Sequence, residues 1–169
     1  MARTHVLGSC AVALLGAALV GCSSGGASAS ATDTSSTSVV SPGASVGAAA
    51  TDVGVTLQEW AVVPEATTLA AGSVHFTISN VGPNDEHEFV VIRTDTPAGS
   101  LPTADTGAVE EDAVGLEVVD EVEELAVGAD GELTVDLTPG HYVVLCNIYN
   151  EAEAESHYKL GMRTDITLE

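Results

Sequence analysis

Four residues of types that bind soft metal ions stand out in this 169-residue sequence: His87, Cys146, His157 and Met162. One thiolate, two imidazoles and one thioether form the donor set of a trigonal His₂Cys site with a weak axial methionine. The soft sulfur donors suit Cu(I), and imidazoles serve both copper oxidation states, so one electron can pass without a change of ligands. Zinc would fit the first three donors but gains little from a distant thioether. These residue types therefore predict one type 1 copper ion.

Cys146 is the only cysteine outside the N-terminal region, which contains Cys10 and Cys22. If Cys10 is removed and Cys22 is acylated, no internal disulfide can form, and a lone thiol in an oxidising compartment needs a binding partner or burial. One alternative is a structural or ligand-binding β-sandwich in which Cys146 is a buried core thiol. Two histidines and a methionine in ligand order favour the metal instead.

The elements that must position these residues are short strands. Apolar residues recur with strand-like spacing between clusters of Gly, Pro, Asn and Asp. The expected strands cover residues 53–63, 74–80, 86–92, 118–125, 132–137, 141–146 and 164–168. Within the least regular region, 105–125, the spacing of Val109, Ala113 and Leu116 predicts one short amphipathic helix. The pattern predicts an all-β domain over residues 51–169, a Greek-key β-sandwich or barrel with one short helical segment.

Alternation of side chains across a strand predicts which histidines face the core. Cys146 and His87 share their faces with apolar residues, namely Tyr142 and Val144 in one strand and Phe89 and Val91 in the other. His75 lies instead on the polar face of its strand, and His141 lies on the face opposite Cys146. We therefore expect His75 and His141 to be surface or hydrogen-bonded histidines and not ligands.

Three stretches, 71–80, 87–91 and 139–148, followed by His157 and Met162, resemble the cupredoxins, the family of plastocyanin, azurin, amicyanin, rusticyanin and sulfocyanin. The resemblance spans nearly the whole domain from Trp60 onward. It implies that His87 is the first imidazole ligand, that Cys146, at the end of the penultimate strand, is the thiolate ligand, and that His157 is the second imidazole. Met162, with four residues between it and His157, takes the axial position.

The segment between the cysteine and the second histidine departs from the family pattern. Cupredoxins usually place two to four residues there, and this chain has ten, including Glu151, Glu153 and Glu155. The ends of such a loop can meet, because closure entropy rises slowly with length, but a longer loop is expected to be less rigid. The three glutamates fit either a solvated loop face or a docking patch for a basic partner.

The resemblance implies electron transfer between exported redox proteins such as cytochromes or a terminal oxidase. His157, expected to be the imidazole nearest the surface, would be the exit path. An alternative is a copper-binding or copper-handling lipoprotein with no electron-transfer role, weak colour and easily lost copper. We expect a monomer and no enzyme activity, because the sequence shows no Ser/His/Asp motif, phosphate loop or second metal motif.

The N-terminal 50 residues predict export and anchoring. Residues 1–21 contain an apolar stretch from Val6 to Val20 and lead into Leu19-Val20-Gly21-Cys22, which resembles the end of a lipoprotein signal peptide with lipidation at Cys22. An ordinary secretory signal is the alternative. The rest of residues 22–50, rich in Ser, Ala and Gly, is expected to be a flexible tether. These features place the domain at the extracytoplasmic face of the cell membrane.

The chain is strongly acidic, with a formal net charge of -21 at pH 7. A surface of that sign repels nucleic acid and attracts basic proteins or metal cations. A salt-tolerant surface with no docking role is an equally simple interpretation.

Overall fold

The computed structural model of the protein describes residues 49–169. The proposed signal segment, Cys22 and nearly all of the proposed tether lie outside these residues. No helix within 49–169 is both long enough and apolar enough to span a bilayer. The elements are β1 Thr51–Gln58, β2 Ala61–Pro64, β3 Thr68–Leu69, β4 Gly72–Asn80, β5 His87–Arg93, the 3₁₀ turn Ala98–Ser100, β6 Glu117–Leu125, β7 Asp130–Leu137, β8 Gly140–Leu145, β9 Tyr149–Asn150, β10 Glu155–Ser156, α1 His157–Leu160 and β11 Arg163–Leu168.

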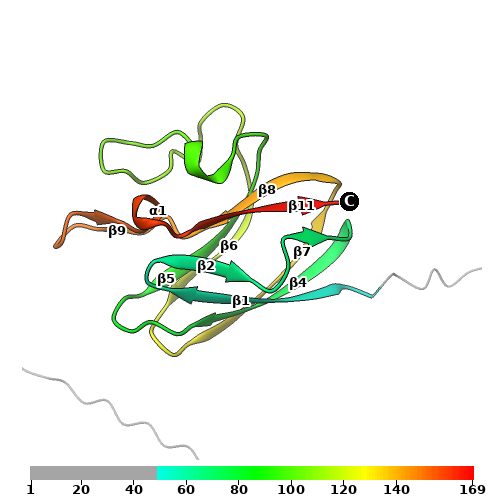
Figure 1. Ribbon diagram of the computed structural model, residues 1–169, viewed down its shortest axis with the longest axis horizontal. Coiled ribbons are helices and arrows are strands. Elements are labelled where there is room, and N and C mark those ends of the chain that lie inside the picture. The colour runs from blue at the N-terminus through cyan, green and yellow to red at the C-terminus, as the bar shows by residue number, and fades with distance from the viewer. Residues whose placement is uncertain (1–48) are drawn as a thin grey trace, which may run out of the picture. The chain divides into compact units, whose positions relative to one another are not determined.

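Two large sheets form the body of the domain, and β9 and β10 form a separate two-stranded sheet (Figure 1). One has the strand order β2-β1-β4-β7, with β1 and β4 parallel, and the other has the order β3-β11-β8-β5-β6. The chain crosses between these two sheets after β2, after β3, after β4, after β6 and after β7. One apolar cluster joins inward residues of both sheets, for example Phe76 of β4 with Phe89 of β5, whose ring centroids are 5.2 Å apart. The prediction of an all-β sandwich is confirmed.

Alternation along the strands explains why each sheet has a buried inner face. In β4, Val74, Phe76 and Ile78 are buried while the residues between them are more accessible. The β7 strand repeats the pattern with Leu133, Val135 and Leu137. Burial of each such side chain contributes about 1.5 to 3 kcal/mol.

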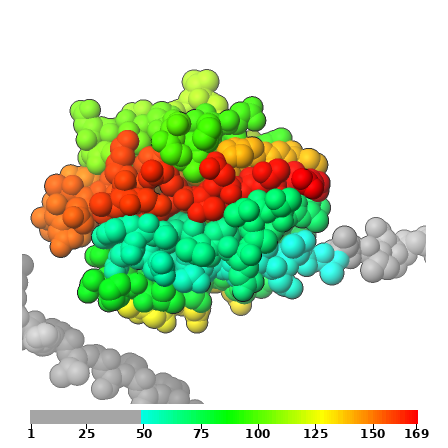
Figure 2. All heavy atoms as spheres, in the orientation of Figure 1, coloured from blue at the N-terminus to red at the C-terminus, as the bar shows by residue number. Residues whose placement is uncertain are grey.

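A second, smaller core lies on the other side of the five-stranded sheet. There, Val90 and Ile92 of β5 and Val143 and Leu145 of β8 pack beneath residues of the 94–116 segment, among them Leu101. Figure 2 shows this green segment lying along the red and orange strands. Strands β5 and β8 are therefore apolar on both faces, which explains the nearly continuous apolar runs in their sequences.

The expected helix around Val109, Ala113 and Leu116 is wrong. This segment consists of turns, with one isolated bridge between Thr103 and Val109. The Asn147 side chain pairs with both backbone groups of Val109, accepting from its N–H at 2.5 Å and donating to its carbonyl at 3.0 Å. These bonds fix Val109 in an extended backbone and prevent a helix from starting there. The short α-helix of this domain is α1.

The expected single strand over residues 53–63 is two strands. A turn at Glu59 and Trp60 folds β2 back against β1, so that Gln58 pairs with Ala61. No Gly, Asn or Asp marks this turn, which is why its sequence resembled a continuous strand.

Asn80, the last residue of β4, ties the loop before His87 to the rest of the sandwich. Its Nδ2 donates to the carbonyls of Asp85 and Leu125 at 2.9 and 2.8 Å, and its Oδ1 accepts from the Gly82 amide at 2.8 Å. The residue is only 1% exposed. Its side chain therefore satisfies backbone groups that water reaches poorly.

Replacing Asn80 with alanine is expected to lower the free energy of unfolding by about 2 to 3 kcal/mol, because buried backbone groups lose their partners. Urea denaturation measures this change. Ser79→Ala is the matched control, since Ser79 makes an exposed hydrogen bond to Asp130, and it should change stability by less than about 0.5 kcal/mol. Equal losses in the two variants would contradict this role for Asn80.

Candidate metal centre

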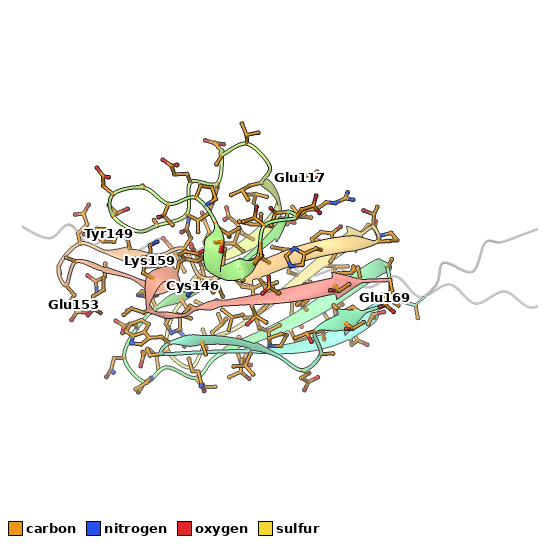
Figure 3. The ribbon with its side chains drawn as sticks, turned by 45° about the horizontal axis from the view of Figure 1, so that its top comes forward. Glu117, Cys146, Tyr149, Glu153, Lys159 and Glu169 are labelled. Carbon is orange, nitrogen blue, oxygen red and sulfur yellow. The ribbon has the colours of Figure 1, made fainter. Side chains whose placement is uncertain are left out.

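The thiol and both imidazoles of the expected site converge at one end of the sandwich. His87 is the first residue of β5, Cys146 directly follows β8, and His157 is the first residue of α1. The Nδ1 atom of His157 lies 3.3 Å from the Cys146 sulfur and 3.2 Å from the Nδ1 atom of His87. One potential ligand atom from each residue lies within 4.8 Å of the others. Figure 3 shows Cys146 beside the helix that carries Lys159, at the end opposite Glu169.

Burial separates these three donors from water. His87 and Cys146 are 0% exposed and His157 is 2% exposed. Burial lowers the pKa of the two histidines, with a further contribution from His157 at His87, and it raises the pKa of Cys146 to about 12. The unliganded site is thus neutral. His157 is slightly more accessible than His87, although both imidazoles are buried.

The donor set fits a soft transition-metal ion. Two ring nitrogens and a sulfur face each other in a buried space, where at most a few of their lone pairs can be satisfied by N–H or S–H groups. Among residues 49–169, the Nε2 atom of His87 is also buried without a hydrogen-bond partner. Such clusters of polar atoms are costly in a protein interior unless a cation binds them. The thiol and imidazole types suit copper or zinc.

The long segment between Cys146 and His157 is a paired hairpin. Strands β9 and β10 pair Asn150 with Glu155 and Tyr149 with Ser156, and the His157 amide extends the pairing by donating to the Ile148 carbonyl at 3.0 Å. The chain therefore leads away from the site at residue 149 and returns at residue 156, directly opposite residue 149. Apart from this hairpin, only Asn147 and Ile148 separate Cys146 from His157, so the additional residues form a paired hairpin and not an open loop.

Ser156 fixes the start of α1 and with it the backbone of His157. Its Oγ atom accepts from the Lys159 amide at 3.2 Å, the usual bond of an N-terminal cap, and donates to the Gly107 carbonyl at 2.8 Å. The residue is buried. This hydroxyl therefore joins the second ligand histidine to the 94–116 segment.

Met162 lies close to the other three residues through its backbone. Its carbonyl accepts from the Cys146 amide, and its amide donates to the His157 carbonyl, each at 3.0 Å. The Met162 side chain is 0% exposed and belongs to the same apolar cluster as Cys146. Axial ligation by its sulfur stays a prediction.

The two remaining histidines of the domain do not join the cluster. His75 Nδ1 lies 2.9 Å from an Asp52 carboxylate oxygen. The two ring nitrogens of His141 lie 2.6 Å from the Thr94 carbonyl and 2.9 Å from an Asp165 carboxylate oxygen. The interpretation of both as hydrogen-bonded histidines is confirmed.

Glu88 and Asn147 were not identified from the sequence. The Glu88 amide lies 3.5 Å from the Cys146 sulfur, and its carboxylate accepts from the Asn147 amide at 2.6 Å. Burial raises the pKa of Glu88 to about 7, opposed by the bond from Asn147. These contacts connect the residues that follow His87 and Cys146. A glutamate in a strand gives no sequence signal of such a role.

In the sequence, Trp60 marked only the start of the resemblance to the cupredoxins. In the structure, its ring lies against both imidazoles. Its ring centroid is 4.9 Å from that of His157 and 6.3 Å from that of His87. Trp60 is partly buried against the main core. Its turn belongs to the sheet opposite the ligands, so the contact depends on the packing of the two sheets.

The hairpin tip carries the carboxylates that the sequence singled out. Glu151 and Glu153 are exposed, Glu155 is intermediate, and Glu153 accepts a hydrogen bond from the Asn150 side chain at 3.3 Å. Figure 3 shows Glu153 at the far end of the hairpin, turned away from the site. A solvated face and a docking patch both fit this position.

No protein-family model and no curated protein matches the chain. Among solved structures, it is similar to reduced auracyanin from Roseiflexus castenholzii, with 19% identity, 72% of this chain and 98% of that chain covered, and a TM-score of 0.49. It is also similar to auracyanin A of Chloroflexus aurantiacus, a "blue" copper protein, with 17% identity, 72% of this chain and 100% of that chain covered, and a TM-score of 0.47. For rusticyanin from Thiobacillus ferrooxidans the identity is 18%, 70% of this chain and 76% of that chain are covered, and the TM-score is 0.47. Rusticyanin is also one of the proteins that the sequence was found to resemble.

Trp60 is the single tryptophan of the chain, so its fluorescence reports directly on the site. Titration with Co²⁺ is expected to quench this fluorescence with a break at one equivalent, because the ion would bind beside the indole. His157→Ala should remove the break, whereas His75→Ala, which changes a histidine outside the cluster, should keep it. A break that survives His157→Ala would show that the ion binds elsewhere.

Proposed function

We propose that the domain is a type 1 copper protein that carries single electrons between redox partners. The observation that supports this most strongly is the convergence of one cysteine sulfur and two histidine nitrogens within 4.8 Å in a buried space. Copper bound there would supply a one-electron couple. We propose a carrier and not an enzyme, because all three donors are buried.

Each ligand residue has a distinct role in this proposal. Cys146 would bind as the thiolate, since a cation at the site favours the charged sulfur and offsets the burial that raises its pKa in the unliganded protein. His87 and His157 have lowered pKa values, so they are already neutral and need lose no proton to bind. Met162 would be the weak axial donor.

A carrier also needs ligands that stay in place when the charge of the metal changes. The His157 backbone is held by Ile148, Ser156 and Met162, and the Cys146 amide is held by Met162. The paired hairpin adds to this rigidity. A fixed donor set keeps the reorganisation small on each electron transfer. A copper-handling protein would gain from a looser site, so these contacts favour the electron carrier.

The test is an absorption spectrum of the purified protein with one equivalent of Cu(II). An intense band near roughly 600 nm is expected, because thiolate-to-copper bonding produces such a transition. Cys146→Ser should abolish the band, and His141→Ala, outside the cluster, should retain it. A colourless complex, or a band unchanged in Cys146→Ser, would contradict the proposal.

The partners that we propose are exported redox proteins with a basic surface, such as cytochromes. The exposed Glu151 and Glu153 lie on the hairpin that leads into His157, and the chain has a net charge of -21. Opposite charge accelerates association, and salt screens this effect.

Replacing Glu151 and Glu153 with glutamine should slow reduction of a basic cytochrome by about threefold or more at low salt, with little effect at high salt. Stopped-flow mixing measures the rate. Glu132 and Asp136, exposed on β7, are the matched control pair, and neutralising them should slow the reaction less. Equal effects of the two pairs would assign the acceleration to overall charge and leave the hairpin solvated.

We further propose that the protein is exported and held at the cell membrane through a lipid on Cys22, with residues 22–50 as its tether. The support is the sequence Leu19-Val20-Gly21-Cys22 after an apolar segment. Mass spectrometry of the mature N-terminus should find an acylated Cys22, and Cys22→Ser should release the protein from membranes. A mature N-terminus at another residue would favour an ordinary secretory signal.

A further inference from the structure

The turn between β1 and β2 reaches the metal centre from the opposite sheet. None of the four proposed ligands comes from this turn, yet the Trp60 ring lies 4.9 Å from the His157 ring, tilted by 58°. The same indole meets the His87 ring edge-on at 6.3 Å, and these two imidazole rings lie 5.1 Å apart. One side chain thus contacts both nitrogen ligands.

The turn is itself attached to the segments on either side of the ligands. The Glu59 carboxylate accepts from the amides of Asn84 and Asp85 at 2.7 and 2.6 Å, in the loop that leads to His87. At Gly161, which precedes Met162, a Cβ atom would lie 2.9 Å from the Trp60 carbonyl. The backbone of the turn therefore packs closely against both the loop before His87 and the segment between His157 and Met162.

His157 is buried beside this neighbour. His157 begins a helix of only four residues at the end of the sandwich, a place where side chains are commonly accessible, yet it is 2% exposed. Trp60 is partly buried, with its remaining surface facing out. An aromatic ring in this position excludes water from the imidazole beneath it and restricts rotation of that ring.

We propose that Trp60 is a positioning residue of the metal centre, whose indole holds the His157 imidazole in its ligating orientation and keeps water away from it. This inference rests on the proposed copper function. Water stabilises the more highly charged oxidised site, so its exclusion raises the reduction potential. A ligand held in place also dissociates less often, so copper is released slowly.

The experiment compares Trp60→Ala and Trp60→Leu with the wild type in the copper-loaded full chain. In Trp60→Ala the charge-transfer band should persist, because all ligands remain. The reduction potential should fall, and a Cu(I) chelator should remove copper about 10-fold faster or more. Trp60→Leu keeps apolar cover without the ring, so it should show smaller changes of the same sign. If the alanine variant does not fold, the leucine variant decides.

Val135→Ala is the control for a general loss of packing. Val135 is a buried core residue that pairs with Val74, which in turn pairs with Thr51 at the start of β1, the end of that strand far from Trp60. This variant should be less stable but should keep the potential and the copper release rate. Unchanged potential and release in both Trp60 variants, or equal changes in Val135→Ala, would overturn the inference.

A measurement without metal separates this inference from the proposed function. In the metal-free protein, NMR relaxation of the His157 ring should show more motion in Trp60→Ala, while the rings of His75 and His141 stay unchanged. If the wild type shows no charge-transfer band, the copper function fails, and the ring motion still decides whether Trp60 positions His157. Equal ring motion in variant and wild type would refute that role.

Discussion

Three neutral donor groups, one thiol and two imidazoles, face each other in the interior of this β-sandwich, and this is the constraint on which the structure depends. Withdrawing them from water is costly because each loses hydrogen bonds to water. The Nε2 atom of His87 has no hydrogen-bond partner within the described domain. A cation bound by all three would offset much of that cost. Because it would bind only the folded chain, its binding free energy would add to the stability of the fold.

The surrounding contacts explain how distant segments reach this position. The loop before His87 is held by Asn80 and Glu59. Asn147, the residue after Cys146, forms hydrogen bonds with Glu88 and with Val109. These bonds come from both sheets and from the 94–116 segment. The site is therefore a property of the assembled sandwich and not of any single loop.

Much of the site could be predicted because the alternation of side chains along a strand determines which residues face the core. The parity of Cys146 with Tyr142 and Val144 placed the thiol on the inner face, and the structure confirms this. The helix expected near Val109 failed because a side chain far along the sequence, Asn147, takes both backbone groups of that residue. Contacts of this kind leave no periodic signal in the sequence.

The hairpin and Trp60 were missed for a similar reason. Ten residues between Cys146 and His157 suggested a loose loop, because the sequence does not reveal that residues 149–156 pair with each other. The role of Trp60 depends on how the two sheets face each other, which single-strand patterns do not encode. Both features increase the order around His157, the ligand whose position was hardest to infer.

The most direct test of the account is X-ray absorption spectroscopy at the copper edge of the loaded protein. The account predicts a first shell of two nitrogen donors and one short sulfur donor, at one copper per chain. A shell of nitrogen and oxygen alone would contradict it, because the ion would then be bound outside the buried Cys146 site.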